Sequence, residues 1–361
     1  MFSPQFQMTP TLTKALMRSE AARLAMSALP IDVTMLSSLR ETARLRATHF
    51  STQIEGNRLT EAEVKDVLAG ASFPGRERDE AEVRNYYRAL SEVEALAGRT
   101  EAIREEDIQR IHGLVLQGQA SATPYRDGQN VIRDAGSGAL VYLPPEAGDV
   151  AALMADLVAW ITNALETDNP PAPIVAALAH YQIATIHPYY DGNGRTARLL
   201  ATLILHRAGY GLKGIYNLDE YYARNLTDYY AALAVGPSHN YYVGRAEPDV
   251  SAVVTYVCEG MADAFSAVLA QAVKAAERGA RDQSALLRRL DPRQRRLLEV
   301  FRRHGTVTAG EIAAHLGLSQ RTVTDLCRAW VATGFLAVHN ASRKNRSYRL
   351  GDVYEAAIGQ L

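Results

Sequence analysis

The sequence is poor in cysteine and carries no excess of either charge. Only two of its 361 residues are cysteines, Cys258 and Cys327, which excludes both a disulfide framework and a cysteine-based zinc site. Lys and Arg number 39 against 40 Asp and Glu, which excludes a histone-like or an acidic-tail protein. Scarce cysteine favours a reducing compartment, so we expect a cytoplasmic protein.

Long apolar runs are also absent. The apolar stretch 150–161 is interrupted by Asp156, and no run reaches the ~18–20 apolar residues that a bilayer span needs. The first ten residues lack the basic patch and the apolar core of a secretory signal. We therefore expect neither a membrane span nor a membrane partner.

What the sequence does contain is helical periodicity, which predicts a mainly α fold. One stretch differs, because β-prone residues at 131–132 and 140–143 flank Gly136-Ser137-Gly138 and predict a β-hairpin. A lone hairpin among helices is expected to be a surface flap. Apolar residues recur at three- and four-residue spacing in predicted helices over 12–29, 32–53, 61–69, 79–97, 105–116, 149–165, 173–186, 193–208, 219–234 and 249–276.

Charge divides the chain near Leu290. Residues 291–361 hold 11 basic and 6 acidic side chains, a net charge of +5, so residues 1–290 carry −6. Pro292 restrains the residue before it and can open a helix, which places a domain boundary there. The predicted organisation is an N-terminal helical region (1–100), a core (101–275), a helical linker (276–290) and a C-terminal domain (291–361).

The run Ile186–Leu199 (IHPYYDGNGRTARL) carries the strongest chemical signal. A predicted helix ends at His187, and a second one begins after a six-residue loop. Gly192 and Gly194 let the backbone approach a ligand closely, and the start of the second helix presents free N–H groups. Together these features form an anion nest suited to phosphates.

The side chains around this loop fit a nucleotide. Arg195 and Arg198 lie one turn apart and can bind further phosphate oxygens. Asp191 offers the hard oxygen ligand that Mg²⁺ on a polyphosphate requires, and His187 has the near-neutral pKa of a general base. The alternative, a helix cap followed by an ordinary turn, explains the glycines but not the histidine and the two arginines.

His187–Arg198 resembles the signature H-x-F-x-D/E-G-N-G-R-x-x-R of Fic-domain proteins. The resemblance covers most of residues 40–275, including Glu82–Leu90 (EVRNYYRAL) and the Tyr229-Tyr230 helix. It implies a Fic-type helical bundle with the hairpin as flap, and transfer of AMP from ATP to a Ser, Thr or Tyr hydroxyl of a target protein. Tyr189 replaces the family's Phe, and its extra hydroxyl needs a partner. Gly194, where a phosphate-transferring relative has Lys, favours nucleotidyl transfer.

The resemblance implies a role for each motif residue. His187 would deprotonate the target hydroxyl, and Asp191 would hold Mg²⁺ at the α- and β-phosphates. Tyr229 would contact the nucleotide, unless it is a core aromatic, and the flap edge Val141-Tyr142 would align the target peptide by strand addition. Arg195 would hold the outer phosphates and Arg198 the γ-phosphate, within an ATP site formed by Gly192, Asn193, Gly194, Arg195, Thr196, Ala197 and Arg198.

Ser51–Asn57 (STQIEGN) ends a predicted helix and resembles the family's inhibitory motif, S/T-x-x-x-E-G/N. Gly56 suits a helix stop. Glu55 lies in the last turn, where the helix dipole disfavours an anion, so it needs a cationic partner. The resemblance pairs Glu55 with Arg198, so that its carboxylate and the γ-phosphate compete for one guanidinium within the ATP site. The alternative for Glu55 is a solvated helix end.

The C-terminal domain resembles a winged helix-turn-helix through the run EIAAHLGLSQRTV. Its recognition helix, 319–333, would turn Arg321 and Thr322 toward the bases of double-stranded DNA. The wing would bring Arg343, Lys344 and Arg346 to phosphates. A protein-docking module is the alternative. The other elements predicted here are helices over 292–304 and 309–315, a short segment at 307–308, and strands over 335–339 and 347–350.

Three functions remain open on these residues. The first is an AMP transferase held inactive by Glu55, and the second is a DNA-binding regulator that senses ATP. The third is an enzyme that removes AMP, in which Glu55 positions a water. His187 and Asp191 argue against a pure sensor, which needs neither a base nor a metal ligand. The target, the DNA site and the oligomeric state, a homodimer included, stay open.

Overall fold

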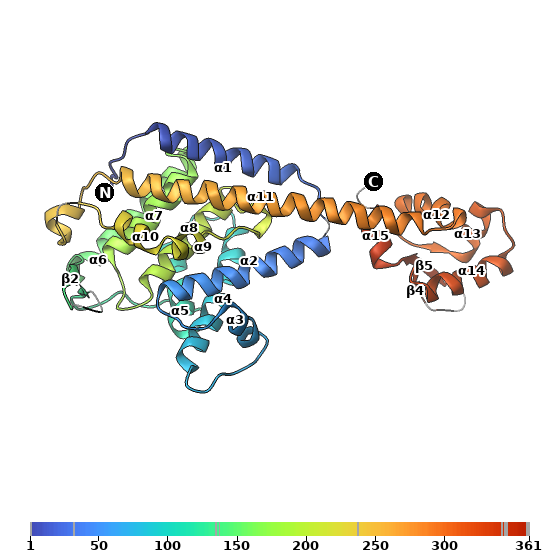
Figure 1. Cartoon of the computed structure of the whole chain (residues 1–361), viewed down its shortest axis with the longest axis horizontal. Helices are drawn as coiled ribbons and strands as arrows, with labels where there is room; N and C mark the ends of the chain where they lie inside the picture. Colours follow the sequence, from blue (N-terminus) through green and yellow to red (C-terminus); the bar gives the residue numbers. More distant parts are fainter. Residues whose placement is uncertain are drawn as a thin grey trace. The chain divides into compact units, whose positions relative to one another are not determined.

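The computed structural model describes residues 2–31, 33–133, 136, 138–236, 238–340, 342 and 346–358. The chain divides into two compact units, Met1–Ala28 with Ser37–Ala270, and Leu29–Leu36 with Gln271–Leu361. Helices dominate both units (Figure 1), which confirms the prediction of a mainly α chain. One boundary between the units follows the end of the first helix, and the other two fall inside the second and the longest helix.

The first unit is built around two packed helices, α7 (Ala172–Ile186) and α8 (Asn193–Arg207). Every residue of α7 except Ala184 is buried, as expected for a helix that is apolar on all sides. The predicted phosphate loop joins these two helices, so it rests on the most buried part of the unit. Around them lie α1 (Pro10–Ala28), α2 (Val33–Ile54), α3 (Glu61–Leu68), α4 (Glu77–Ala97), α5 (Glu105–Gln117), α6 (Ala147–Thr167), η1 (Leu212–Gly214), α9 (Asp219–Arg224), α10 (Leu226–Leu233), η2 (Tyr241–Arg245) and α11 (Ser251–Arg288).

Most helices of the first unit match their predicted bounds within two residues, and two differ by more. The helix expected over 219–234 is divided at Asn225, whose backbone is not helical (φ −118°, ψ 43°) and whose side chain donates to the Tyr221 carbonyl at 2.8 Å. Asn competes for backbone hydrogen bonds in this way, which ends α9 early. The helix expected to end at 276 continues as α11 to Arg288.

The predicted hairpin residues form the antiparallel pair β1 (Ile132–Arg133) and β2 (Leu140–Tyr142). Of the predicted turn residues, Ser137 lies outside the described residues. The Tyr142 hydroxyl donates to the Thr185 carbonyl at 2.6 Å, and the Arg245 guanidinium lies 4.2 Å from the centroid of the Tyr142 ring. These contacts attach the hairpin to the C-terminal end of α7 and to η2.

The second unit has a small sheet with strand order β3-β5-β4, all antiparallel. Leu297, Ile312, Val323 and Trp330 are buried in its core. The side chains of Asp291, Thr308 and Ser319 cap its helices, as such residues do at N-termini. The elements are α12 (Pro292–Arg303), β3 (Val307–Thr308), α13 (Ala309–Leu316), α14 (Gln320–Ala332), β4 (Leu336–Asn340), β5 (Ser347–Leu350) and α15 (Asp352–Ile358), of which α15 was not predicted.

The expectation that no segment is long enough to span a membrane needs correction. In the described part of the chain, α6 and residues Ser251–Ala276 of α11 have the length and the apolar composition of a membrane-spanning helix. A membrane-spanning helix tolerates an isolated charge such as Asp156, so an interrupted apolar run does not rule one out. Each helix buries an apolar face within the first unit, which includes Met154 of α6 and Val254 of α11.

Candidate functional site

The loop between α7 and α8 is closed by the side chain of Asn193. The Tyr189 N–H donates to Asn193 Oδ1 at 2.9 Å, and Asn193 Nδ2 donates to the Tyr189 carbonyl at 2.8 Å. Asn193 is buried, so its side chain shapes the loop rather than pointing at a ligand. Thr196 and Ala197, also expected near the phosphates, are fully buried in α8.

The two glycines of the loop serve different needs. Gly192 has φ +75° and caps α8 in the left-handed backbone conformation, which residues other than Gly rarely adopt. Gly194 is helical, but a Cβ there would lie 2.5 Å from Glu55 Oε1 and 3.2 Å from Arg198 Nη1. Gly194 therefore lets the Glu55 carboxylate approach Arg198 across the start of α8.

His187 ends α7 with φ +52° and is anchored through its backbone. The buried Arg126 donates from Nε to the His187 carbonyl at 3.0 Å and from its backbone N–H to the Pro188 carbonyl at 2.9 Å. His187 Nδ1 lies 3.4 Å from the Ala184 carbonyl, so Nδ1 is the donor and Nε2 is left as the acceptor. Burial, helped by the charge of Arg126, lowers the pKa of His187 and keeps the ring neutral.

Asp191 is the exposed carboxylate of the loop. Its side chain is 53% exposed, and Oδ1 accepts from the Gly192 N–H at 2.6 Å and from Arg195 Nη2 at 3.3 Å. His112 donates from Nε2 to the Asp191 carbonyl at 2.9 Å and stacks on Tyr189 with ring centroids 3.5 Å apart. Among the described residues, the buried Tyr189 hydroxyl has no hydrogen-bond partner.

A magnesium ion carried by a nucleotide fits Asp191. Within the described residues no three His, Cys, Asp or Glu side chains gather as a metal cluster. Mg²⁺ is usually bound through one or two carboxylates together with phosphates and waters. A single exposed carboxylate beside a phosphate nest matches that donor set, whereas it would not hold a metal ion alone.

Arg198 is buried and surrounded by acceptors. It donates from Nε to Ser51 Oγ and from Nη2 to the Ser51 carbonyl, both at 2.9 Å. Nη2 also donates to Glu55 Oε1 at 3.0 Å, and Nε lies 3.1 Å from Asp219 Oδ1. The predicted pair of Glu55 and Arg198 is therefore in contact, and Asp219 adds a second carboxylate.

These partners keep Arg198 charged. Burial alone lowers the pKa of Arg198, but Tyr229, Glu55 and Asp219 outweigh it and raise that pKa well above its usual range. Tyr229 is itself buried, its hydroxyl bonds to His180 Nε2 at 2.9 Å, and it lies 3.5 Å from Arg198 Nη1. Tyr229 therefore supports Arg198 from the core.

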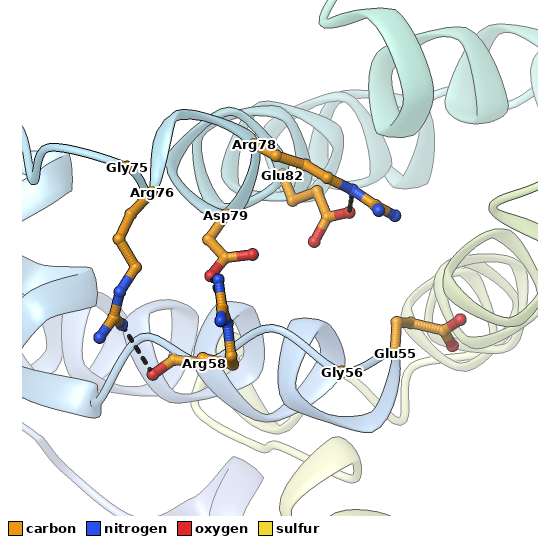
Figure 2. A pocket seen from close by; sticks show the side chains of 8 residues that line it. All are labelled: Glu55, Gly56, Arg58, Gly75, Arg76, Arg78, Asp79 and Glu82. Carbon is orange, nitrogen blue, oxygen red and sulfur yellow. Dashed lines mark hydrogen bonds and ion pairs between the residues drawn. The ribbon is translucent and has the colours of Figure 1, made fainter. Parts of the chain in front are cut away.

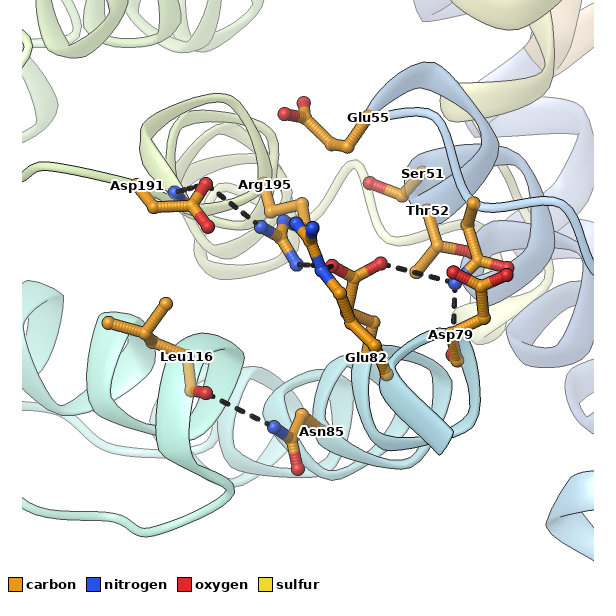
Figure 3. A network of polar contacts seen from close by, with 12 residues as sticks. Ser51, Thr52, Glu55, Asp79, Glu82, Asn85, Leu116, Asp191 and Arg195 are labelled. Atoms are coloured by element: carbon orange, nitrogen blue, oxygen red, sulfur yellow. Dashed lines mark hydrogen bonds and ion pairs between the residues drawn. The ribbon is translucent and has the colours of Figure 1, made fainter. Parts of the chain in front are cut away.

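Arg195 lies between two carboxylates (Figure 3). Its Nη2 meets Asp191 Oδ1 at 3.3 Å, and its Nη1 lies 3.8 Å from Glu82 Oε1. Like Arg198, Arg195 is only 3% exposed. Both arginines of the motif are thus buried and held by acidic side chains that come from other parts of the chain as well as from the loop.

Sequence reasoning missed the residues that support the site. Glu82 stands in the run EVRNYYRAL, which was noted for its resemblance but given no role. Asp219, His112 and Arg126 have no signal in the local sequence, because each reaches the motif from a distant segment. Only the folded chain brings them to the loop.

The outer edge of the β1–β2 hairpin is partly covered by the chain itself. The Leu143 N–H donates to the His239 carbonyl at 2.8 Å, and the Tyr241 N–H donates to the Leu143 carbonyl at 3.0 Å. His239 Nδ1 also donates to the Val141 carbonyl at 2.6 Å. Val141 is exposed, but Tyr142 is buried, so of the two predicted edge residues Val141 is the accessible one.

The predicted DNA-facing residues of the second unit lie on its surface where they are described. Arg321 and Thr322 are exposed in the first turn of α14, and the Thr322 hydroxyl bonds to the Ser319 hydroxyl at 2.8 Å. Arg346 is exposed at the start of β5, 5.8 Å from the centroid of the Tyr348 ring. Arg343 and Lys344 lie outside the described residues.

Comparison with known proteins identifies the same region. Residues 102–205 match the model of the Fic/DOC family. Protein adenylyltransferase Fic of Drosophila willistoni is 32% identical over 196 residues, which are 53% of this chain and 38% of that protein. The protein of the same name from Drosophila mojavensis is 34% identical over 194 residues, which are 52% of this chain and 37% of that protein. The chain thus spans less than two fifths of the length of these relatives.

Solved structures agree on the fold. A Fic family protein from Desulfovibrio desulfuricans G20 is 22% identical with a TM-score of 0.57, over 97% of this chain and 99% of that one. Fic-1 (residues 134–508) from C. elegans is 25% identical with a TM-score of 0.56, over 74% of this chain and 73% of that one. The helical arrangement of this chain is therefore similar to that of solved Fic proteins.

Proposed function

Because the chain belongs to the Fic/DOC family, we propose that it transfers AMP from ATP to a hydroxyl of a target protein and that Glu55 restrains this transfer. Its relatives in Drosophila are named protein adenylyltransferases. The phosphate loop, the neutral histidine and the exposed carboxylate supply what such a reaction needs. A target with an accessible Ser, Thr or Tyr completes the proposal.

The contact between Glu55 and Arg198 carries the inhibitory part of the proposal. Arg198 Nη2 donates to Glu55 at 3.0 Å, and this guanidinium is the one assigned to the γ-phosphate. A carboxylate and a phosphate oxygen cannot occupy one donor together, so Glu55 competes with ATP. When the γ-phosphate is displaced, the α-phosphorus is badly placed for in-line attack.

The residues of the site divide the chemistry among them. His187 Nε2 takes the proton of the target hydroxyl while the oxygen of that hydroxyl bonds to the α-phosphorus. The bond from that phosphorus to the bridging oxygen breaks, and pyrophosphate leaves from the end held by Arg195 and Arg198. Asp191 would hold Mg²⁺, which when bound offsets negative charge on the phosphates.

Incubation with ATP labelled in its α-phosphate tests this function. Target proteins or the chain itself should become labelled by Glu55→Gly and hardly at all by the unaltered protein. An Arg–carboxylate contact contributes on the order of 1.5–3 kcal/mol, or roughly ten- to a hundredfold in the competent population. Glu55→Gly combined with His187→Ala is the matched control and should lose the labelling.

Two outcomes would contradict the proposal. Equal labelling by the unaltered protein and Glu55→Gly would remove the inhibitory role of Glu55. If Glu55→Gly instead loses the ability to release AMP from a modified protein, the chain is an AMP-removing enzyme in which Glu55 positions a water.

We also propose double-stranded DNA as the partner of the second unit. The observation that favours DNA is the exposure of Arg321 at the start of α14 and of Arg346 before β5. Arginines at a recognition helix and a wing suit base edges and phosphates, respectively. Titration of the full chain with duplex DNA at low salt tests this partner, and absence of binding would favour a protein-docking module.

A further inference from the structure

Glu82 of α4 is a carboxylate beside Arg195 that lies outside the phosphate loop. Its Oε1 lies 3.8 Å from Arg195 Nη1, and the two side chains are 14% and 3% exposed. In Figure 3, Glu82 lies on the side of Arg195 opposite to Asp191. Nε of Arg195 has no hydrogen-bond partner in the described part of the chain, so these two carboxylates largely determine where the guanidinium points.

Glu82 is itself fixed by the segment that carries Glu55. Asn57, two residues after Glu55, is buried and donates from Nδ2 to Glu82 Oε2 at 3.2 Å and to the Asp79 carbonyl at 2.9 Å. The backbone N–H of Asn57 donates to the Thr52 carbonyl at 3.1 Å. The end of α2 thus reaches Arg198 directly through Glu55 and Arg195 indirectly through Asn57 and Glu82.

A cavity borders this arrangement (Figure 2). Its volume is about 250 Å³. Arg78 approaches Glu82 Oε1 at 3.2 Å, but the Arg78 side chain is 81% exposed. An i,i+4 pair with one exposed partner adds only a few tenths of a kcal/mol. The residues that line the cavity are Glu55, Gly56, Arg58, Gly75, Arg76, Arg78, Asp79 and Glu82.

We propose that Glu82 is a positioning residue that holds Arg195 toward the outer phosphates of ATP. This inference rests on the proposed function and deepens it. Asp191 is the exposed carboxylate and would also hold the metal ion, whereas Glu82 is 14% exposed and is given no ligand but Arg195 to orient. Groups that orient the ligands of metal sites typically change affinity ten- to a hundredfold when they are removed, and we expect an effect at the lower end of that range for a group that orients Arg195.

Glu82 differs in this respect from Glu55. Glu55 makes a hydrogen bond to the donor that a phosphate needs, so it must leave before the γ-phosphate binds. Glu82 stands at 3.8 Å on the far side of Arg195 and is anchored by Asn57, so it can stay in place while Arg195 binds phosphate through Nη2.

Nucleotide binding tests the proposal without any transfer step. Calorimetry with Mg²⁺ would compare ATP and AMP on Glu55→Gly and on Glu55→Gly with Glu82→Gln. The Glu82→Gln side chain retains an acceptor for Asn57 but loses the charge that attracts Arg195. We expect the Kd of ATP to rise about tenfold and that of AMP, which has no outer phosphates, to stay within about twofold. Equal losses for ATP and AMP would overturn the proposal.

A double-mutant cycle shows whether Glu82 acts through Arg195. If it does, adding Glu82→Gln to Arg195→Gln weakens ATP binding no further, whereas additive losses would contradict the proposal. Arg78→Gln removes the exposed partner of the same carboxylate and should leave the Kd of ATP unchanged. Glu80→Gln removes another carboxylate of α4, which pairs with Arg84, and should lower Tm without changing the ratio of the ATP and AMP affinities.

The two proposals can fail separately. Absence of AMP transfer by Glu55→Gly would remove the proposed function, while a selective loss of ATP affinity in Glu82→Gln would still support the role of Glu82. The reverse result, transfer with no selective loss, would remove only the role of Glu82.

Discussion

Arginines proposed to meet phosphates occur in two regions, and the two regions hold them in opposite ways. Arg195 and Arg198 of the first unit are each 3% exposed and contact carboxylates. Arg321 and Arg346 of the second unit are exposed. A buried cation is costly unless it is paired, whereas an exposed one remains hydrated.

The difference is consistent with the proposed inhibitory role of Glu55 in the first unit. If the two buried arginines bind phosphates, as we propose, they need other anions beside them while no nucleotide is bound. Glu55, Asp191 and Asp219 supply them, and Glu82 adds a longer contact. Two of these carboxylates are hydrogen-bonded to the arginines: Glu55 contacts the donor of Arg198 that we propose for the γ-phosphate, and Asp191 is the proposed metal ligand. Arg321 and Arg346 of the second unit are exposed to water, so they need no such anions.

Removing a buried arginine should have the largest effect. Arg198→Met leaves the buried Asp219 without its ion-pair partner, and we expect the free energy of unfolding to fall by about 3–5 kcal/mol. Arg321→Met, the exposed control, should change it by less than about 0.5 kcal/mol. Denaturant unfolding measures both. Adding Asp219→Asn to Arg198→Met should restore part of the loss, and equal small effects at both arginines would contradict the comparison.

Asp191→Ala should have the next largest effect, which is on AMP transfer, since Asp191 is the exposed carboxylate that contacts the buried Arg195. AMP transfer by Glu55→Gly should fall at least a hundredfold, which is about 2.7 kcal/mol in the barrier. The gain in ATP affinity on adding Mg²⁺ should also disappear, because the proposed metal ligand is gone. Titrating ATP with and without Mg²⁺ checks this, and an unchanged metal dependence would exclude Asp191 as a ligand.

The pH dependence of AMP transfer tests whether His187 is the base. Burial and the charge of Arg126 lower the pKa of His187, and a base must be neutral to accept a proton. The rate should therefore fall only as pH drops through that lowered pKa, and stay level above it. In Glu55→Gly, kcat/KM should inflect below the ordinary histidine value of about 6.5. An inflection at or above that value would show that another group is the base.

The smallest effect is expected at the exposed arginines of the second unit. Arg346→Ala should weaken duplex binding about equally for all sequences and reduce the slope of log affinity against log salt by about 1. Arg321→Ala should instead weaken binding most for one preferred sequence. Titrations of several duplexes at several salt concentrations distinguish these results, and a slope unchanged by Arg346→Ala would exclude its phosphate contact.

The sequence predicts what is local and misses what the fold assembles. Helical periodicity locates most helices, and His187 to Arg198 stand together in one run, so their chemistry is legible without a structure. The break at Asn225 depends on a single side-chain hydrogen bond, which periodicity does not show. Asp219 of α9 and Glu82 of α4 come close to the two arginines only in the folded chain.

The expected pair of Glu55 and Arg198 lies between these extremes. The two residues are separated by 143 positions, yet the resemblance of two short motifs predicts their contact, and the structure places them 3.0 Å apart. Nothing in the sequence shows that Gly194 leaves the space for this approach. That requirement appears only when a Cβ at Gly194 is set against the Glu55 carboxylate.

The most direct test of the central claim compares ATP with ADP, which lacks the γ-phosphate. Affinities would be measured on the unaltered protein, on Glu55→Gly and on the isosteric Glu55→Gln. If Glu55 occupies the γ-phosphate donor of Arg198, both variants should bind ATP roughly ten- to a hundredfold more tightly, while their affinity for ADP stays within about twofold. An equal gain for ATP and ADP, or no gain for either, would contradict the account.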